Sequence, residues 1–353
     1  MKLSKRISSI PTGLTAIVVV YALSMTGCFA PEPEFRFNEA YLRLQESKSA
    51  ELGENREQVK QNIKDILVGL YGTPNEPHLP PIEGMAEVVD FENLKIAAGK
   101  TQSIDEDGTR QGLYREHCAH CHGITGDGRG PTAEFLNPYP RDYREGVIKF
   151  KSTIGKMPPT DDDLQRILHE GIPGTAMPSF RLLRSFEREA LVDYVRYLSI
   201  RGQTERWLIE YALELEEGQV AWDVGGSDED QMLMKSDIEE GVGQIVAAHL
   251  TALENQIVVP EPPADWESAE SIAHGRELFA GTVANCIKCH GLTALGDGVV
   301  NDYDDWTKPY YDPTTAGSVE KFDAKFAPDH TLLDPRPIRP RNLRMNVFRG
   351  GRR

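Results

Sequence analysis

A Cys-x-x-Cys-His pentapeptide occurs twice in this chain of 353 residues, at Cys118–His122 and at Cys286–His290. Each copy places two thiols three residues apart and an imidazole directly after the second thiol. Such a cluster is typical of covalent haem attachment, of zinc sites and of redox dithiols. These two short segments therefore constrain what the rest of the chain folds around.

The distance between the two cysteine pairs favours haem over zinc. The pairs are 168 residues apart, whereas the pairs of a zinc ribbon usually lie about 15–20 residues apart. A thioredoxin-like dithiol requires a βαβ context, which neither pair has. In a haem site, each thiol forms a thioether with one vinyl group and the following histidine coordinates the iron. We therefore predict two haem c groups, with thioethers at Cys118, Cys121, Cys286 and Cys289 and proximal ligands at His122 and His290.

Further landmarks follow both pentapeptides and indicate an internal repeat. Glycine-rich segments follow directly, and a Pro-Arg dipeptide begins each later landmark, at 140–144 and 340–344. On these motifs, residues 105–200 and 268–353 resemble class I bacterial cytochrome c domains, and the whole resembles a dihaem cytochrome c. The resemblance implies a mainly α fold with two helical haem domains joined by a helical insertion.

Composition and periodicity divide the chain into five expected segments. These are a signal peptide at 1–27, a lipid tether with a helix and linker at 28–104, domain one at 105–202, a helical insertion and linker at 203–267, and domain two at 268–353. We expect helices at about 38–71, 186–200 and 268–279, and we expect Gly202 to end the second of these. Thr160–Asp163 has the form of a capping box for a further helix, which Gly171 ends.

The N-terminus resembles that of a bacterial lipoprotein. A basic start precedes an apolar stretch and then Met25–Cys28, a pattern typical of an exported protein. The lipobox resemblance implies that Cys28 is lipidated, and the other four of the five cysteines belong to the haem motifs. The alternative is an uncleaved membrane helix, although the apolar run at 16–23 is shorter than the about 20 residues that a span needs. We expect a lipid anchor on the periplasmic side of a bacterial membrane.

The resemblance also implies distal ligands and propionate contacts for the first haem. Methionine is the usual sixth ligand of a cytochrome c iron. Met177 lies in a segment that resembles the methionine loop of class I cytochromes, and Met157 is the alternative ligand. Arg141 and Arg341 occupy places where related cytochromes often have an arginine near a haem propionate. A solvated loop arginine is equally compatible with the sequence at both places.

The second domain lacks a counterpart of the Met177 loop. By the Pro-Arg landmarks Met345 corresponds to Glu145, although Met345 lies as far beyond Cys286 as Met177 lies beyond Cys118. His330 is a further candidate distal ligand. We expect this domain to be incomplete at its C-terminus and its haem to be open on the distal side.

The motifs and the charge together predict an electron carrier rather than an enzyme. The formal net charge of −16 argues against nucleic-acid binding and favours partners with basic docking patches. We expect single electrons to pass between redox proteins, with a membrane oxidase or reductase as a candidate partner. One alternative is a peroxidase-like enzyme that uses the open second haem. Another is a haem-bearing subunit of an oxidase or reductase complex.

Overall fold

The computed structural model describes residues 32–47, 53–100, 112–216, 219–223, 225–299, 303–304, 307–315, 317–326 and 331–349. Helices dominate these residues, and the described part of the chain contains isolated β-bridges but no strand. The predicted mainly α fold is therefore confirmed. Within the same ranges, no helix is both long enough and apolar enough to cross a membrane. The expected signal peptide, Cys28 and His330 lie outside the described residues.

Residues 34–353 form one compact unit, to which the described helices belong. The α-helices are α2 (Glu39–Glu46), α3 (Arg56–Tyr71), α4 (Met85–Val88), α5 (Phe91–Ala97), α6 (Leu113–His117), α7 (Ala119–His122), α8 (Asp161–Glu170), α9 (Ser185–Glu214), α10 (Asp228–Leu250), α11 (Ala269–Ala280), α12 (Ile287–His290) and α13 (Ser318–Phe326). Short 3-10 helices are η1 (Gly53–Asn55), η2 (Ala133–Phe135), η3 (Tyr143–Glu145), η4 (Ala252–Asn255) and η5 (Leu343–Met345).

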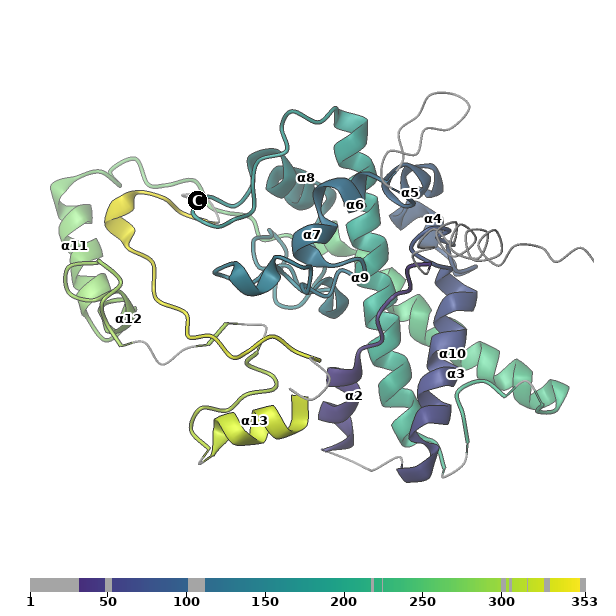
Figure 1. The fold of residues 1–353 in the computed structure, drawn as a ribbon. Coiled ribbons are helices and arrows are strands. Elements are labelled where there is room, and N and C mark those ends of the chain that lie inside the picture. The colour runs from purple at the N-terminus through teal and green to yellow at the C-terminus, as the bar shows by residue number, and fades with distance from the viewer. Residues whose placement is uncertain are drawn as a thin grey trace, which may run out of the picture. The chain divides into compact units, whose positions relative to one another are not determined.

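Helix α9 is the element on which several other helices pack (Figure 1). It contacts α2, α3, α5, α6, α8 and α10. Leu191, Leu198 and Leu208, which lie along its length, are all buried. A helix that is covered on several sides has apolar residues around much of its circumference. The long helix α9 therefore forms the centre of the core and carries one wall of the site described below.

Helix α9 continues through Gly202, where the sequence predicted an end, and stops at Glu214. The expectation for Gly202 was wrong because this glycine serves close packing instead. A Cβ atom added to Gly202 would lie 2.6 Å from Cβ and 2.8 Å from Cγ of Arg144 in η3. The first helix of the expected insertion is therefore the second half of α9, and its buried Leu208 and Ile209 belong to the same core as domain one.

Local signals set the ends of other helices as predicted. The Thr160 side chain accepts a hydrogen bond from the Asp163 backbone N–H, and the Asp163 carboxylate accepts one from the Thr160 N–H, so the capping box is confirmed. Gly171 follows α8, and Ser268 caps α11. The helical segment expected at 38–71 contains two helices, α2 and α3.

The stretch at 302–335, which domain one lacks, carries a small apolar cluster. Phe322 and Phe326 of α13 pack with Tyr311 and with Ala40 of α2. Arg43 of α2 donates a hydrogen bond to the carbonyl oxygen of Lys325 at 2.6 Å. Residues near both ends of the chain are therefore in contact.

Candidate haem sites

One turn of helix places the reactive side chains of the first pentapeptide. The backbone N–H groups of Cys121 and His122 donate to the carbonyl oxygen of Cys118 at 3.1 and 2.9 Å. Gly123 ends the turn with a φ of 74°, a conformation that side chains disfavour. Cys118, Cys121 and His122 consequently line one cavity.

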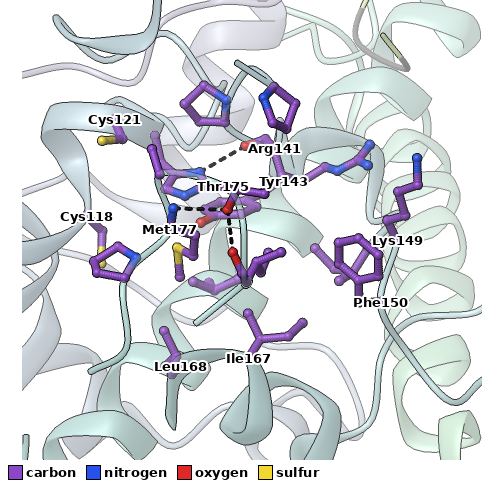
Figure 2. Close-up of a pocket in the computed structure, with 18 of the residues that line it drawn as sticks. Cys118, Cys121, Arg141, Tyr143, Lys149, Phe150, Ile167, Leu168, Thr175 and Met177 are labelled. Atoms are coloured by element: carbon purple, nitrogen blue, oxygen red, sulfur yellow. Dashed lines mark hydrogen bonds between the residues drawn. The ribbon is translucent and has the colours of Figure 1, made fainter. Parts of the chain in front are cut away.

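This cavity has a volume of about 290 Å³ and lies beside α7 (Figure 2). Figure 2 shows Cys118 and Cys121 on one side of it and Lys149 and Phe150 on the other. Most of its walls are apolar and come from α8, α9 and the loops between η3 and α9; they include Ile148, Leu164, Ile167, Leu168, Ile172, Phe180, Leu191, Val192 and Val195. Two thiols, an imidazole and a thioether sulfur around an apolar cavity fit the donor set of a haem c with histidine and methionine ligands.

The His122 ring is held in an orientation that suits a metal ligand. Its Nδ1 atom lies 3.1 Å from the backbone carbonyl oxygen of Arg141. A carbonyl only accepts, so Nδ1 carries the proton and the Nε2 lone pair remains available. Burial lowers the pKa of His122 to about 4, which keeps the ring neutral. The Tyr143 ring stacks on the imidazole with centroids 4.8 Å apart and an interplanar angle of 18°.

A ring of hydrogen bonds holds Met177 at the cavity. The Met177 N–H donates to Oγ1 of Thr175 at 3.1 Å, and the Thr175 hydroxyl donates to the carbonyl oxygen of Ile172 at 2.8 Å (Figure 2). The Ile172 N–H returns a bond to the Met177 carbonyl oxygen at 3.1 Å. The loop thus presents the Met177 side chain to the same cavity as His122.

The other candidates near this cavity divide into two groups. Met157 does not line the cavity, and its carbonyl oxygen accepts a hydrogen bond from Nζ of Lys151 at 2.6 Å. Arg141 does line it. The structure therefore brings Met177, and not Met157, together with His122.

The second pentapeptide has the same local backbone geometry. Helix α12 is one turn in which the His290 N–H donates to the Cys286 carbonyl oxygen at 2.9 Å. Gly291 ends it with a φ of 76°. The Nδ1 atom of His290 lies 2.9 Å from the carbonyl oxygen of Arg341, as that of His122 lies near Arg141. Each Pro-Arg landmark thus provides a backbone acceptor for the histidine of its own pentapeptide.

The repeat also includes the 3-10 turn that follows each Pro-Arg dipeptide. In η3 the Asp142 side chain accepts from the Arg144 N–H at 2.9 Å, and in η5 the Asn342 side chain accepts from the Arg344 N–H at 3.0 Å. Met345 ends η5 as Glu145 ends η3. The Met345 side chain is 65 % exposed. It therefore occupies the position of Glu145 and not that of Met177.

The surroundings of the two pentapeptides differ in burial. Cys118 is buried and His122 is 9 % exposed. By contrast, Cys289 is exposed, Cys286 and His290 are half-buried, and the preceding helix α11 has no buried residue. The His274 side chain in α11 is also exposed and lies 3.9 Å from Glu277.

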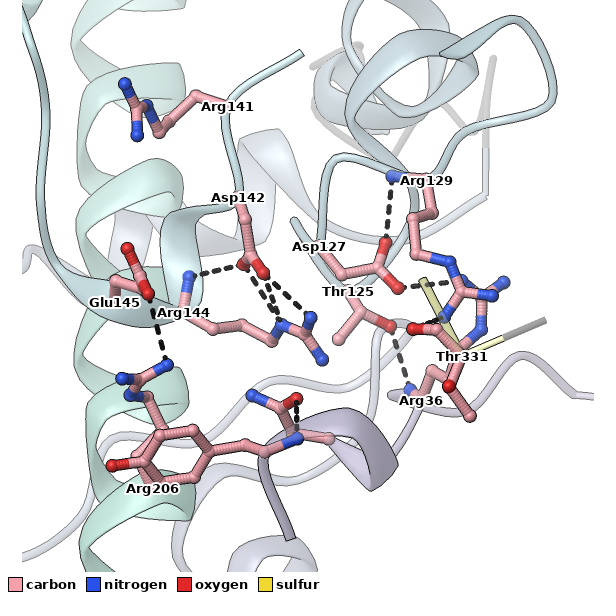
Figure 3. Close-up of polar contacts among 12 residues, drawn as sticks. Arg36, Thr125, Asp127, Arg129, Arg141, Asp142, Arg144, Glu145, Arg206 and Thr331 are labelled. Carbon is pink, nitrogen blue, oxygen red and sulfur yellow. Dashed lines mark hydrogen bonds and ion pairs between the residues drawn. The ribbon is translucent and has the colours of Figure 1, made fainter. Parts of the chain in front are cut away.

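Ion pairs and hydrogen bonds to two aspartates stabilise the loops around the first site (Figure 3). The Asp127 carboxylate accepts from Arg36 at 2.7 Å and from the Arg129 N–H at 3.2 Å. Arg144 binds both oxygens of Asp142, at 3.0 and 2.7 Å. Burial favours the neutral form of Arg144, but the Asp142 carboxylate raises its pKa overall. The charged contacts thus fix the glycine-rich loop and η3, which carries Tyr143.

Sequence reasoning missed several residues that shape this site. It did not identify the stacking of Tyr143, the hydroxyl of Thr175 or the backbone role of Arg141. The repeated Pro-Arg landmark was the available signal for the last of these. Stacking and loop hydrogen bonds have no comparable sequence pattern.

A comparison with protein families agrees with this geometry. The sequence profile of the family described as Cytochrome c matches residues 110–199. A comparison with curated proteins found no match. Among solved structures, a chain of the reducing HAO-like protein complex of Kuenenia stuttgartiensis is similar, with 22% sequence identity, a TM-score of 0.41, and coverage of 71% of this chain and 79% of that chain. Residues 110–199 form a cytochrome c domain, which supports a covalently bound haem c and a haem-based redox role.

Proposed function

We propose that this protein is a dihaem cytochrome c that carries single electrons between redox proteins on the periplasmic side of a bacterial membrane. The observation that carries the proposal is the apolar cavity shared by Cys118, Cys121, His122 and Met177. A bound haem c would supply the one-electron chemistry, and the protein would set its potential and its access to partners.

The residues around the first cavity have distinct roles in this proposal. Cys118 and Cys121 hold the haem through thioethers, and His122 offers its Nε2 lone pair to the iron. Met177 would supply a thioether ligand to the iron, and such a ligand raises the reduction potential. The apolar walls exclude water, which also affects the potential. The carbonyl oxygen of Arg141 fixes the tautomer of His122.

The second haem is supported by the repeated geometry at Cys286, Cys289 and His290. The one-turn helix and the contact from Nδ1 to a carbonyl oxygen recur there. The exposure of Met345 is consistent with a second haem that lacks methionine ligation. The membrane anchor rests on the N-terminal sequence alone, with Cys28 as the lipidated residue.

Haem counting tests the proposal. The full chain would be produced in bacteria with a c-type haem maturation system, and covalent haem would be measured by pyridine haemochrome absorbance and intact mass. We expect two haems per chain. The double variants Cys118→Ala/Cys121→Ala and Cys286→Ala/Cys289→Ala should each retain one. A wild-type chain without covalent haem would overturn the proposal, and a wild-type chain with one haem would overturn its dihaem part.

A second assay tests the anchor. Wild-type protein should partition into the detergent phase and carry a lipid mass at Cys28, whereas Cys28→Ser should do neither. If the wild-type protein remains in the aqueous phase and carries no lipid, the anchor is wrong while the haem chemistry is unaffected.

The exposed second pentapeptide favours one alternative function, that of a peroxidase-like enzyme. Its Cys289 is exposed and Met345 does not occupy the place of a distal ligand. A haem held there by Cys286, Cys289 and His290 without a sixth ligand would be high-spin and would supply peroxide chemistry. Absorption and magnetic circular dichroism spectra of the reduced protein decide the question, because two low-spin haems exclude this alternative.

A further inference from the structure

A segment of the second repeat, residues 338–349, borders the cavity of the first. Ile338 and Arg349 line that cavity. The Arg341 guanidinium lies against Gly174 in the Met177 loop, where a Cβ atom on Gly174 would lie 2.7 Å from Cζ of Arg341. This C-terminal segment therefore forms part of the wall around the first haem site.

The same segment carries a cation, Arg349, that has a buried and unsatisfied nitrogen atom among the described residues. The Nε atom of Arg349 is buried and has no hydrogen-bond partner among the described residues. Burial lowers the pKa of Arg349, and the neighbouring charge of Arg341 lowers it further. A buried donor without an acceptor is costly, and more so when it is charged. An anion beside Arg349 would satisfy this buried nitrogen.

The charged side chains that line the cavity are mostly cationic. Arg141, Lys149 and Arg349 face it, and Asp304 is the carboxylate among the described lining residues. The Asp304 carboxylate accepts hydrogen bonds from the N–H and the hydroxyl of Thr307 at 3.0 and 3.3 Å. The Asp304 carboxylate thus already accepts two hydrogen bonds from within its own turn. An anionic ligand group would complement this excess of positive charge.

Backbone contacts connect this segment to the second site. The carbonyl oxygen of Arg341 lies 2.9 Å from Nδ1 of His290. Nε of Arg341 donates to the carbonyl oxygen of Val347 at 2.7 Å, which folds the segment back on itself just before Arg349. One stretch of chain therefore contacts the proximal histidine of the second site and the methionine loop of the first.

We propose that Arg349 binds a propionate carboxylate of the haem held at Cys118 and Cys121, so that residues 338–349 form a wall shared by both haem sites. The proposal rests on the proposed function, since it requires a haem in the first cavity. A guanidinium matches a carboxylate in geometry and charge and can donate two parallel hydrogen bonds. A cation near the haem stabilises the reduced form, which carries one positive charge fewer.

The experiment is a spectroscopic redox titration of the dihaem protein, its Arg349→Gln variant and an Arg344→Gln control. Arg344 lies in the same segment, is exposed and does not line the cavity. The Cys286→Ala/Cys289→Ala variant assigns the potential of the first haem. Arg349→Gln should lower that potential and shift the propionate bending band in the resonance Raman spectrum. Arg344→Gln should leave both unchanged.

Two results would overturn the proposal. One is a first-haem potential and Raman band that are unchanged in Arg349→Gln. The other is an equal fall of the potential in both variants, which would indicate only a loss of surface charge. If Arg349→Gln fails to mature, Arg349→Lys keeps the charge but not the paired donors, and it should retain the potential while shifting the Raman band. Absence of haem at Cys118 and Cys121 in the wild type would instead count against the proposed function.

Discussion

The Nδ1 atom of His122 lies 3.1 Å from the backbone carbonyl oxygen of Arg141. The arginine side chain is not needed for this contact, because the acceptor belongs to the main chain. Arg141→Ala should therefore retain covalent haem and a low-spin absorption spectrum at the first site. The haem content and the spectrum of the purified variant check this. A high-spin first haem in Arg141→Ala would show that the side chain, and not the carbonyl oxygen, orients His122.

Met177 and Met157 offer a matched pair of variants. Met177 lines the cavity with His122, whereas Met157 does not. Met177→Leu should remove the far-red charge-transfer band of methionine-ligated iron and lower the potential of the first haem, since a thioether ligand raises it. Met157→Leu, which makes the same change of side chain, should alter neither. The reverse pattern would assign the ligand to Met157.

Thr175 should stabilise the bond between Met177 and iron by holding its loop. Its hydroxyl accepts from Met177 N–H and donates to the carbonyl oxygen of Ile172. Thr175→Val keeps the shape of the side chain but removes both bonds, and one hydrogen bond contributes about 1 kcal/mol. For the two bonds together, added imidazole should then displace the methionine at up to about thirtyfold lower concentration. Thr175→Ser retains the hydroxyl and should bind imidazole as the wild type does; equal affinities in all three proteins would contradict the prediction.

Replacement of Gly202 by a larger residue should destabilise the protein, although Gly202 lies within a helix. Its Cα faces Arg144, and an added Cβ would lie 2.6 Å from that residue's Cβ. Gly202→Ala should lower the free energy of unfolding by about 1–3 kcal/mol, the usual cost of overpacking. Gly243 in α10 has no atom within 4 Å of an added Cβ, so Gly243→Ala should raise the free energy of unfolding by up to about 1 kcal/mol. Denaturant titrations should show a lower free energy of unfolding for Gly202→Ala and a higher one for Gly243→Ala.

His249 should make folding sensitive to mild acid. Burial lowers its pKa to about 3, and the charge of Arg196 acts in the same direction. As pH falls below about 6.5, the unfolded chain binds a proton that the folded protein does not bind until about pH 3. This group alone should therefore reduce the free energy of unfolding by about 2 kcal/mol between pH 7 and pH 5.

The His249→Gln variant isolates that contribution. Denaturant titrations at pH 7 and pH 5 should show a smaller loss of stability in this variant than in the wild type. His274→Gln is the control, because the His274 side chain is 70% exposed. An unchanged pH dependence in His249→Gln would show that this histidine takes up its proton in the folded state.

Local sequence was sufficient for the parts of this protein that depend on neighbouring residues. The capping box at Thr160 and the glycine after α8 involve hydrogen bonds within one turn. The pentapeptides likewise form single helical turns whose bonds span three or four residues. The correspondence of Met345 with Glu145 follows from the repeated Pro-Arg landmark and recurs in η3 and η5.

Tertiary structure alone decided which distant segments meet. The sequence could not show that Gly202 faces Arg144, because this contact joins η3 to a helix nearly sixty residues away. It offered Met157 and Met177 as candidate ligands, and only the packing of α8 and α9 around the cavity showed that Met177, and not Met157, lies there with His122. Nor could it show that Arg349 of the second repeat lines the first cavity. The pentapeptides determined the chemistry of each site through short-range bonds, whereas side-chain packing between remote segments determined its surroundings.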